Sequence, residues 1–167
     1  MEEERAPVRA KVVPNDGWDE RLHIFRAGED VDTFGLITQR FLVVVDTMGT
    51  PELATEIMQS LQRVRQGRHM VVINTHADWD HCWGNSIFAN IEGRYAAPII
   101  GHAKTRARMQ SQAARDKLAQ KQAEDPRFAT VKLAPPTVTF SETLCLDGGD
   151  LTLELIPTPG HTEDHVA

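Results

Sequence analysis

Two apolar segments, one on each side of a helix-like segment, constrain the fold of this chain more than any other feature. Residues 41–47 (FLVVVDT) and residues 69–75 (HMVVINT) each contain an unbroken run of apolar side chains. A strand with one face in water alternates apolar and polar residues, whereas a strand that is apolar throughout is covered on both faces. We therefore predict that both segments are buried strands.

The segment between these strands carries the signals of a helix at both ends. Thr50 can cap the first turn, Pro51 suits the first helical position, and Gly67 suits the stop. The apolar residues in between share one helical face, which is typical of a helix that packs on a core. That face carries Leu53, Ile57, Leu61 and Val64.

Shorter β-type segments lie on both sides of this unit. Residues 21–27 and 31–39 precede the first buried strand, and residues 136–157 return to strands. Between them, residues 102–124 are rich in Ala, Gln, Lys and Arg without a strong helix breaker, so we expect one long, largely solvated helix. The order of strands and helices predicts a mixed α/β layer fold.

The first 20 residues differ from the rest of the chain. They are charged and contain Pro7, Pro14 and Gly17, so we expect a flexible tail with little core of its own. Residues 21–167 would then form the folded part.

Composition indicates an ordinary globular chain with 41% hydrophobic and 25% charged residues. The net charge of −6 does not favour nucleic acid or an anionic membrane as a partner. The apolar runs are far shorter than the roughly 20 residues that span a bilayer. The N-terminus lacks the apolar core of a secretory signal, so a cytoplasmic location is the default expectation. Two cysteines make no disulfide framework.

The end of the second buried strand is dense in metal-ligand side chains. The stretch THADWDH contains His76, Asp78, Asp80 and His81. On an extended chain, residues two apart point to the same side, so the first three can converge, while His81 can face a second centre if the chain turns. Imidazole and carboxylate groups bind Zn²⁺, Fe or Mn, and a cation would relieve the repulsion between the two aspartates. The alternative is a polar loop in which an aspartate caps a helix.

A second segment favours the metal-site hypothesis. Residues 156–167 (IPTPGHTEDHVA) again follow an apolar strand and present His161 through a Pro-Gly turn. Two strand ends of one sheet can aim at the same point, so His161 would complete a three-ligand set with His76 and one of the two aspartates. For His165 we expect a structural role.

Together, THADWDH and TPGHTEDH resemble the paired motifs of the metallo-β-lactamase superfamily, in which His-x-His-x-Asp-His follows a buried strand and Pro-Gly-His-Thr comes later. Asp46, after the first buried strand, also fits the family's N-terminal region. The resemblance runs from about residue 21 to the end of the chain. It implies a four-layer αββα sandwich.

The resemblance also implies roles for the motif residues. His76, Asp78 and His161 would hold the first metal. Asp80 and His81 would contribute to the second. A metal-bound hydroxide would attack a carbonyl or related electrophile, and Asp80 would orient it and so act in catalysis. The expected cofactor is Zn²⁺, as one or two ions.

The chain departs from the family's pattern at the second histidine of the motif, where it has Asp78. A carboxylate there resembles the flavodiiron branch of the superfamily, which carries Glu at that place and binds iron. Hard oxygen ligands shift metal preference, so Fe or Mn are alternatives to zinc.

A second departure is that the chain stops six residues after His161, whereas the family's bridging carboxylate and final histidine lie beyond that motif. We therefore expect the N-terminal half of the sandwich, with the C-terminal half largely absent. Such a half would expose an apolar sheet face that includes residues such as Leu151, Leu153 and Leu155 or their neighbours. We expect self-association or pairing with a separate C-terminal fragment to cover it.

The resulting functional hypothesis is a metal-dependent hydrolase that acts on a small-molecule ester, lactone, thioester or lactam. The alternative is a non-catalytic metal-binding or interaction module, or a fragment that needs a C-terminal partner.

Residues near the motifs have simpler interpretations. We expect Cys82 to be a small core residue and not a nucleophile. Trp79 and Trp83 either wall the site or fill the core. The cluster Lys104, Arg106 and Arg108 is expected to be a solvated basic face and not an anion site.

Overall fold

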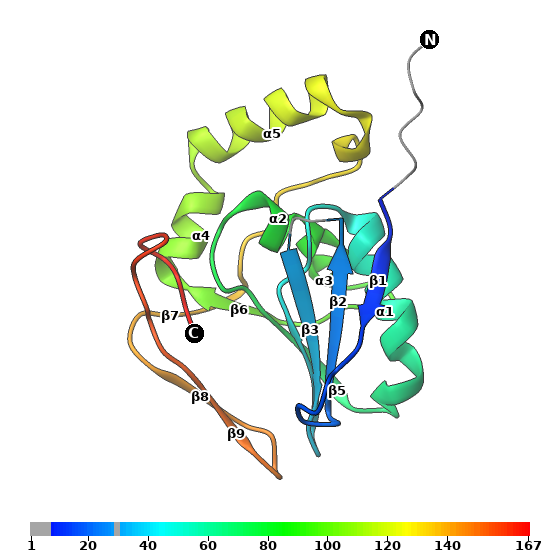
Figure 1. Ribbon diagram of the computed structural model, residues 1–167. Helices are drawn as coiled ribbons and strands as arrows, with labels where there is room; N and C mark the ends of the chain where they lie inside the picture. Colours follow the sequence, from blue (N-terminus) through cyan, green and yellow to red (C-terminus); the bar gives the residue numbers. More distant parts are fainter. Residues whose placement is uncertain (1–7, 29–30) are drawn as a thin grey trace.

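The computed structural model describes residues 8–28 and 31–167 as a seven-stranded sheet, a two-stranded hairpin and a set of helices (Figure 1). The strands are β1 (Ala10–Val13), β2 (Leu22–Ala27), β3 (Val31–Ile37), β4 (Phe41–Val45), β5 (His69–Ile73), β6 (Ile99–His102), β7 (Val138–Phe140), β8 (Leu144–Asp147) and β9 (Thr152–Leu155). The helices are α1 (Pro51–Arg65), α2 (Trp79–Cys82), α3 (Ser86–Ala89), α4 (Ala103–Met109) and α5 (Gln112–Glu124), with 3₁₀ turns η1 (Trp83–Asn85) and η2 (Pro126–Phe128). The predicted mixed α/β class is confirmed.

The large sheet changes from antiparallel to parallel pairing at β4. Strands β1 to β4 pair antiparallel in sequence order, and β4 to β7 pair parallel. Parallel neighbours need crossover connections, and these contain α1, then α2 and α3, then α4 and α5. The carboxyl ends of β4, β5 and β6 therefore meet at one edge, which is where ligands bind in open α/β sheets.

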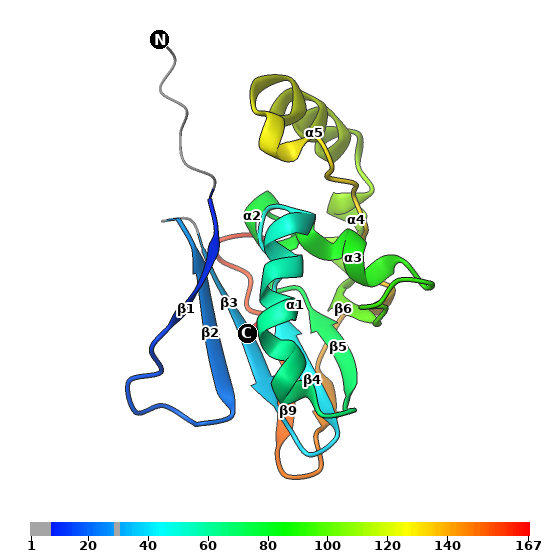
Figure 2. The ribbon, with the colours of Figure 1, turned by 90° about the vertical axis from the view of Figure 1, so that its right-hand side faces the viewer.

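Helix α1 follows the predicted signals. The side chain of Thr50 accepts a hydrogen bond from the backbone N–H of Leu53, and Pro51 is the first helical residue. The helix ends where Gln66 and Gly67 adopt positive φ. Its buried face packs on the sheet (Figure 2) and consists of Ala54, Ile57, Met58 and Leu61.

Both buried strands are covered on both faces, as predicted. In β4, Leu42 and Val44 pack in the cluster with α1, whereas Val43 packs in the cluster with Leu155 of the β8–β9 hairpin. In β5 the residues alternate in the same way. Figure 1 shows α1 and the hairpin on opposite sides of the sheet. The described residues thus form a helical layer, the main sheet and a two-stranded second sheet.

The expected exposed apolar face is wrong for the three leucines named from the sequence. Leu155 is buried, and Leu151 and Leu153 are half-buried. The hairpin turns back onto β4, β5 and β6, and Leu153 and Leu155 join the apolar cluster on that side of the sheet. A short hairpin therefore covers part of the face that the sequence alone left open.

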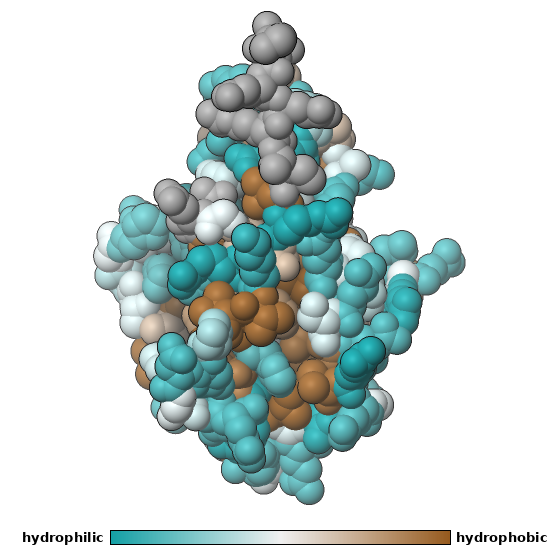
Figure 3. Space-filling model, turned by 45° about the vertical axis from the view of Figure 1, so that its right-hand side comes forward, coloured by the Kyte–Doolittle hydropathy of each residue, from teal (hydrophilic) through white to brown (hydrophobic). Residues whose placement is uncertain are grey.

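Two expectations about the elements also need correction. The sheet begins at Ala10, because β1 pairs with β2 along its whole length, so part of the expected tail is an edge strand. Its Val12 is 67% exposed. Figure 3 shows apolar side chains among hydrophilic ones on one face of the molecule. Residues 1–7 lie outside the described residues.

The predicted single helix over residues 102–124 is two helices. Ser111 adopts an extended conformation, and its side chain accepts a hydrogen bond from the N–H of Ala114, which caps α5. The expectation of a solvated helix is confirmed for α5, which has no buried residue, but not for α4, which buries Thr105 and Met109. No helix in the described ranges combines the length and the apolarity needed to cross a membrane.

Candidate metal centre

Two distant segments meet at the carboxyl edge of the parallel strands. The loop after β5 carries the first motif, and the chain after β9 folds back so that Pro157 and Val166 form a β-bridge. The N–H of Val166 donates to the carbonyl of Thr75 (2.9 Å), and the side chain of Val166 is buried. These contacts bring the second motif beside the first.

Three predicted ligands converge at this point. One ligand atom from each of His76, Asp78 and His161 lies within 4.8 Å of the other two. Oδ2 of Asp78 is 3.4 Å from Nε2 of His76 and 3.3 Å from Nε2 of His161. Ligand bonds of 2.0–2.1 Å around a tetrahedral Zn²⁺ separate neighbouring ligand atoms by about 3.3 Å. These two separations are close to the spacing of ligand atoms around a metal ion.

The buried imidazole of His76 supplies an independent test of this fit. Its Nδ1 lies 2.9 Å from Oγ1 of Thr75, whereas its Nε2 has no hydrogen-bond partner among the described residues. A buried polar atom without a partner is costly and calls for an explanation such as an ion. A cation held together with Asp78 and His161 would satisfy Nε2.

Asp46 orients two of the motif histidines, His81 directly and His76 through Thr75. Its Oδ2 accepts hydrogen bonds from Oγ1 of Thr75 (2.8 Å) and Nδ1 of His81 (2.7 Å), and Thr75 in turn contacts His76. Asp46 is buried, with a φ of 63° that Asp adopts more easily than most residues. Since Nδ1 of His81 donates to a carboxylate, its Nε2 is the nitrogen available for a ligand.

Asp80 and His81 are not part of the three-residue cluster but lie next to it. Oδ2 of Asp80 is 3.8 Å from Nε2 of His81, and the rings of His81 and His76 are 4.2 Å apart between centroids. The ring of His165 lies 5.1 Å from that of His76, and its Nδ1 is 3.0 Å from Oγ1 of Thr158. The contact with Thr158 ties the two sides of the C-terminal turn together.

The local charges set the protonation states of the cluster. Burial, and then the charge of His81, lower the pKa of His76, which favours the neutral imidazole that a metal needs. Burial alone would raise the pKa of Asp78, but the hydrogen bond from Arg108, the charges of His76 and Arg108 and the hydrogen bond from His161 together lower it. Burial alone would lower the pKa of His81, but the hydrogen bond to Asp46 and the charges of Asp46, Asp80 and Asp78 together raise it.

Comparison with known protein families shows to which family the chain belongs. The model of the metallo-beta-lactamase superfamily matches residues 29–167. The chain belongs to the metallo-beta-lactamase superfamily. Among curated proteins, a search found no match.

Solved structures of metallo-beta-lactamases share the fold of this chain. The FEZ-1 enzyme from Legionella gormanii aligns with a TM-score of 0.64 at 15% identity, over 87% of this chain and 53% of its own. The BJP-1 enzyme from Bradyrhizobium japonicum gives 0.60 at 16%, over 87% and 52%. The metallo-beta-lactamase from Pontibacter korlensis gives 0.60 at 19%, over 94% and 65%. This metallo-beta-lactamase-like chain thus spans about half to two thirds of the length of these proteins.

Arg108 is a site residue that the sequence interpretation missed. Its guanidinium donates to Oδ1 of Asp78 (3.0 Å) and also pairs with the fully buried carboxylate of Asp164. Asp164 accepts from the N–H of Ala77 (2.8 Å), so Arg108 and Asp164 link the two motifs. The expectation of a solvated basic face is therefore wrong for Arg108. A signal in the sequence is its spacing from Thr105, because residues three apart lie on one side of a helix and Thr105 is buried.

The remaining expectations near the motifs are resolved by packing. Asp78 sits at the N-cap position of α2, but its side chain makes no capping hydrogen bond, so the polar-loop alternative lacks the cap that would explain Asp78. Cys82 is fully buried, and burial raises the pKa of its thiol well above the ordinary value, which confirms a core residue. Trp83 is 3% exposed and packs with Trp79 and Phe128. Both tryptophans also line a pocket, so they fill the core and wall a cavity at once.

Proposed function

We propose that this chain carries part of the catalytic centre of a metal-dependent hydrolase that acts on an ester, lactone, thioester or lactam. The observation that supports it most is the convergence of His76, Asp78 and His161 around a buried imidazole nitrogen that lacks a partner. Membership of the metallo-beta-lactamase superfamily supports the reaction class. The substrate, the metal and the activity of these residues are parts of the proposal.

His76, Asp78 and His161 would hold the first divalent cation. Asp80 and His81 would contribute to a second one, since Nε2 of His81 faces Asp80 and not Asp46. When bound, such a cation supplies Lewis acidity and lowers the pKa of a water toward neutrality.

The chain's own residues would do the positioning. Asp46 would hold His81 in one tautomer through the hydrogen bond to Nδ1. Arg108 would hold Asp78 by its Oδ1, which leaves Oδ2 directed toward the two histidines. Asp80, which the sequence predicts as the catalytic residue, would orient the attacking water through its carboxylate.

Metal identity follows from the donor set. Zinc is proposed first, but Asp78 replaces an imidazole by an anionic oxygen, which favours Fe or Mn more than three histidines would. Elemental analysis of protein from unsupplemented medium, compared with Asp78→His, tests this. The zinc fraction should rise in the variant, and an unchanged metal ratio would argue that Asp78 is not a ligand.

The function itself is tested by a hydrolysis screen with matched variants. The protein is loaded with Zn²⁺, Mn²⁺ or Fe²⁺ and assayed against chromogenic esters, a lactone, a thioester and a lactam. Turnover should disappear with a chelator and fall at least about a hundredfold in His76→Ala, whereas the exposed His69→Ala serves as the control. Turnover that survives both the chelator and His76→Ala contradicts the proposal. Stoichiometric metal without turnover would favour a non-catalytic module.

We also propose that an uncovered part of the main sheet binds a second copy of the chain or a C-terminal partner segment. Val13, Ile24, Phe34 and Val45 are successive cross-strand partners and are all half-buried. An apolar row across four strands is typical of a surface that another structure covers. Light scattering should give a mass above that of one chain, and a stable monomer would contradict binding of a second copy.

A further inference from the structure

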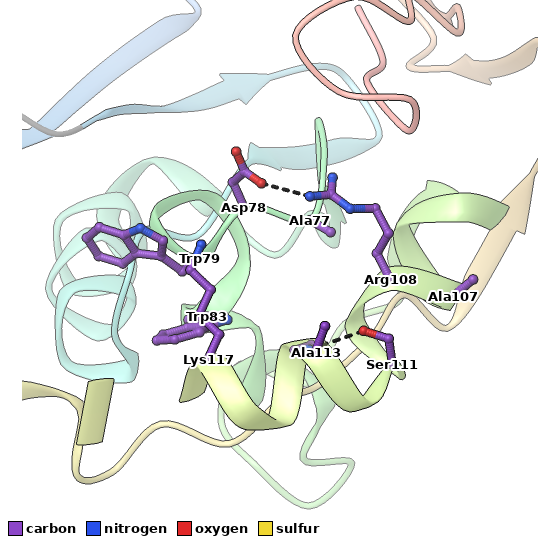
Figure 4. A pocket seen from close by; sticks show the side chains of 10 residues that line it. Ala77, Asp78, Trp79, Trp83, Ala107, Arg108, Ser111, Ala113 and Lys117 are labelled. Atoms are coloured by element: carbon purple, nitrogen blue, oxygen red, sulfur yellow. Dashed lines mark hydrogen bonds and ion pairs between the residues drawn. The ribbon is translucent and has the colours of Figure 1, made fainter. Parts of the chain in front are cut away.

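A pocket of about 480 Å³ lies directly beside the candidate metal centre. One wall is the first motif, with Asp78, Trp79 and Trp83, and the other is made by α4, α5 and their junction (Figure 4). Since Asp78 also belongs to the three-ligand cluster, the pocket adjoins the candidate centre. Ligand pockets of small-molecule enzymes have volumes of roughly 300–1,000 Å³.

The walls suit a flat apolar group. Trp79 and Trp83 line the pocket on the motif side, and α4 and α5 contribute alanines to its lining, so much of the lining is apolar. Trp83 is locked by Phe128, with 5.6 Å between ring centroids, and Trp79 contacts the same ring at 5.4 Å. Rigid aromatic walls bind aryl or alkyl groups with little loss of conformational freedom.

The charges around the pocket suit an anion. Arg108 and Lys117 reach toward it from α4 and α5 on opposite sides (Figure 4). Arg108 is already paired with Asp78 and Asp164. Lys117 is exposed and forms no ion pair with any residue in the described ranges. The nearby Lys121 stacks over Trp79 at 4.5 Å, so this end is locally positive in an acidic chain.

We propose that this pocket selects substrates that carry an apolar aryl or alkyl group and one carboxylate, with the apolar group against Trp79 and Trp83 and the carboxylate on Lys117. The bond to be cleaved would then lie toward Asp78. The inference rests on the proposed hydrolase function for its meaning, but binding to the pocket can be measured without turnover.

The binding test uses three probes of matched size on the metal-free protein: 4-phenylbutyrate, 4-phenylbutanol and 4-phenylbutylammonium. Indole N–H resonances of Trp79 and Trp83 should shift and saturate with the anion, while the exposed Trp18 serves as an internal control. Lys117→Met should weaken 4-phenylbutyrate about tenfold and leave 4-phenylbutanol unchanged. Lys104→Met, an exposed lysine outside the pocket lining, is the matched control.

A second variant tests the apolar part. Ala113→Phe places a large side chain in the lining from a helix without buried residues, so it should abolish binding of both the anion and the alcohol while the protein stays folded. The inference is overturned if the cation binds as tightly as the anion, if Trp79 and Trp83 do not shift, or if Ala113→Phe binds the probes normally.

Turnover separates this inference from the proposed function. On the metal-loaded protein, Lys117→Met should raise KM for an aryl ester with a carboxylate and not for its neutral analogue, with kcat little changed. Hydrolysis in which both esters respond equally would overturn the pocket and keep the hydrolase. Specific probe binding without any hydrolysis would keep the pocket and overturn the hydrolase.

Discussion

The two walls of the pocket are built in different ways. On the motif side, polar side chains are buried and paired: Asn85 donates to Asn74 and to the carbonyl of Ala134, and Thr47 donates to Asn85. On the other side, α5 buries no residue and is held mainly by its neighbours α4 and η2. The motif wall thus depends on the core, whereas α5, which carries Lys117 on the other wall, does not. Substitutions in the motif wall would therefore disturb the metal geometry, whereas substitutions in α5 could change substrate specificity while the core stays intact.

The largest expected effect is on the motif wall. In Gly84→Ala the new Cβ would lie 2.0 Å from the carbonyl oxygen of Thr47, a backbone atom that cannot move away cheaply. We expect a loss of about 3 kcal/mol or more in the free energy of unfolding. Gly160→Ala, where nothing lies within 4 Å, is the control and should be near neutral. Urea denaturation measures both, and a tolerated Gly84→Ala would show that this wall is softer than its packing indicates.

Breaking the ion pair between Arg108 and Asp164, which links the two motifs, should lower the free energy of unfolding somewhat less than Gly84→Ala does. Asp164→Asn keeps the shape but removes the charge that pairs with Arg108, and we expect a loss of about 2 kcal/mol at neutral pH. Burial alone would raise the pKa of Asp164, but the hydrogen bonds from Arg108, Thr162 and Thr105 and the charge of Arg108 together hold the pKa below its ordinary value.

The pH dependence of this link has a defined sign. A lowered pKa in the folded state contributes stability above the ordinary carboxyl pKa, and this contribution is lost as pH falls through the lowered value. The difference between Asp164→Asn and the parent should therefore shrink in acid. Denaturation at several pH values checks it, with the exposed Asp16→Asn as control. A constant difference would mean that the charge of Asp164 does not matter.

Metal affinity also distinguishes the two walls, and Asp46→Asn tests this on the motif wall. The variant keeps its size but weakens the hydrogen bonds that orient Thr75 and His81, so metal affinity should fall roughly tenfold to a hundredfold. Competition with a chromophoric chelator gives the affinity, and Asp116→Asn on α5 is the control. Equal affinity in the two variants would remove Asp46 from the proposed site.

The smallest effect is expected on α5. Ala119→Gly lowers helix propensity by about 1 kcal/mol locally, but a helix that is not part of the core can open without global unfolding. The midpoint of urea unfolding should hardly change, while amide hydrogen exchange in α5 should be fast compared with α1 and faster still in the variant. Slow exchange in α5, as slow as in α1, would erase the difference between the walls.

Local sequence determined the elements whose signals are local. The apolar runs of β4 and β5 are buried on both faces, and α1 begins and ends where Thr50, Pro51 and Gly67 predicted. Of its predicted apolar face, Ile57 and Leu61 are buried, whereas Leu53 and Val64 are partly buried against the same cluster. The motifs predicted which residues would gather, since His76, Asp78 and His161 do meet. Each of these depends on periodicity, turn chemistry or a short motif, which neighbouring residues carry by themselves.

Tertiary structure decided what depends on residues far apart in the chain. The hairpin that buries Leu155, and the pairing of β1 with β2, come from contacts that no local pattern specifies. The role of Arg108 also depends on a distant residue, because its partner Asp164 lies 56 residues away along the chain. Without that partner, a basic residue on a helix is expected to lie in solvent. A buried charge is stable only where its counter-charge arrives, and only the fold brings the two together.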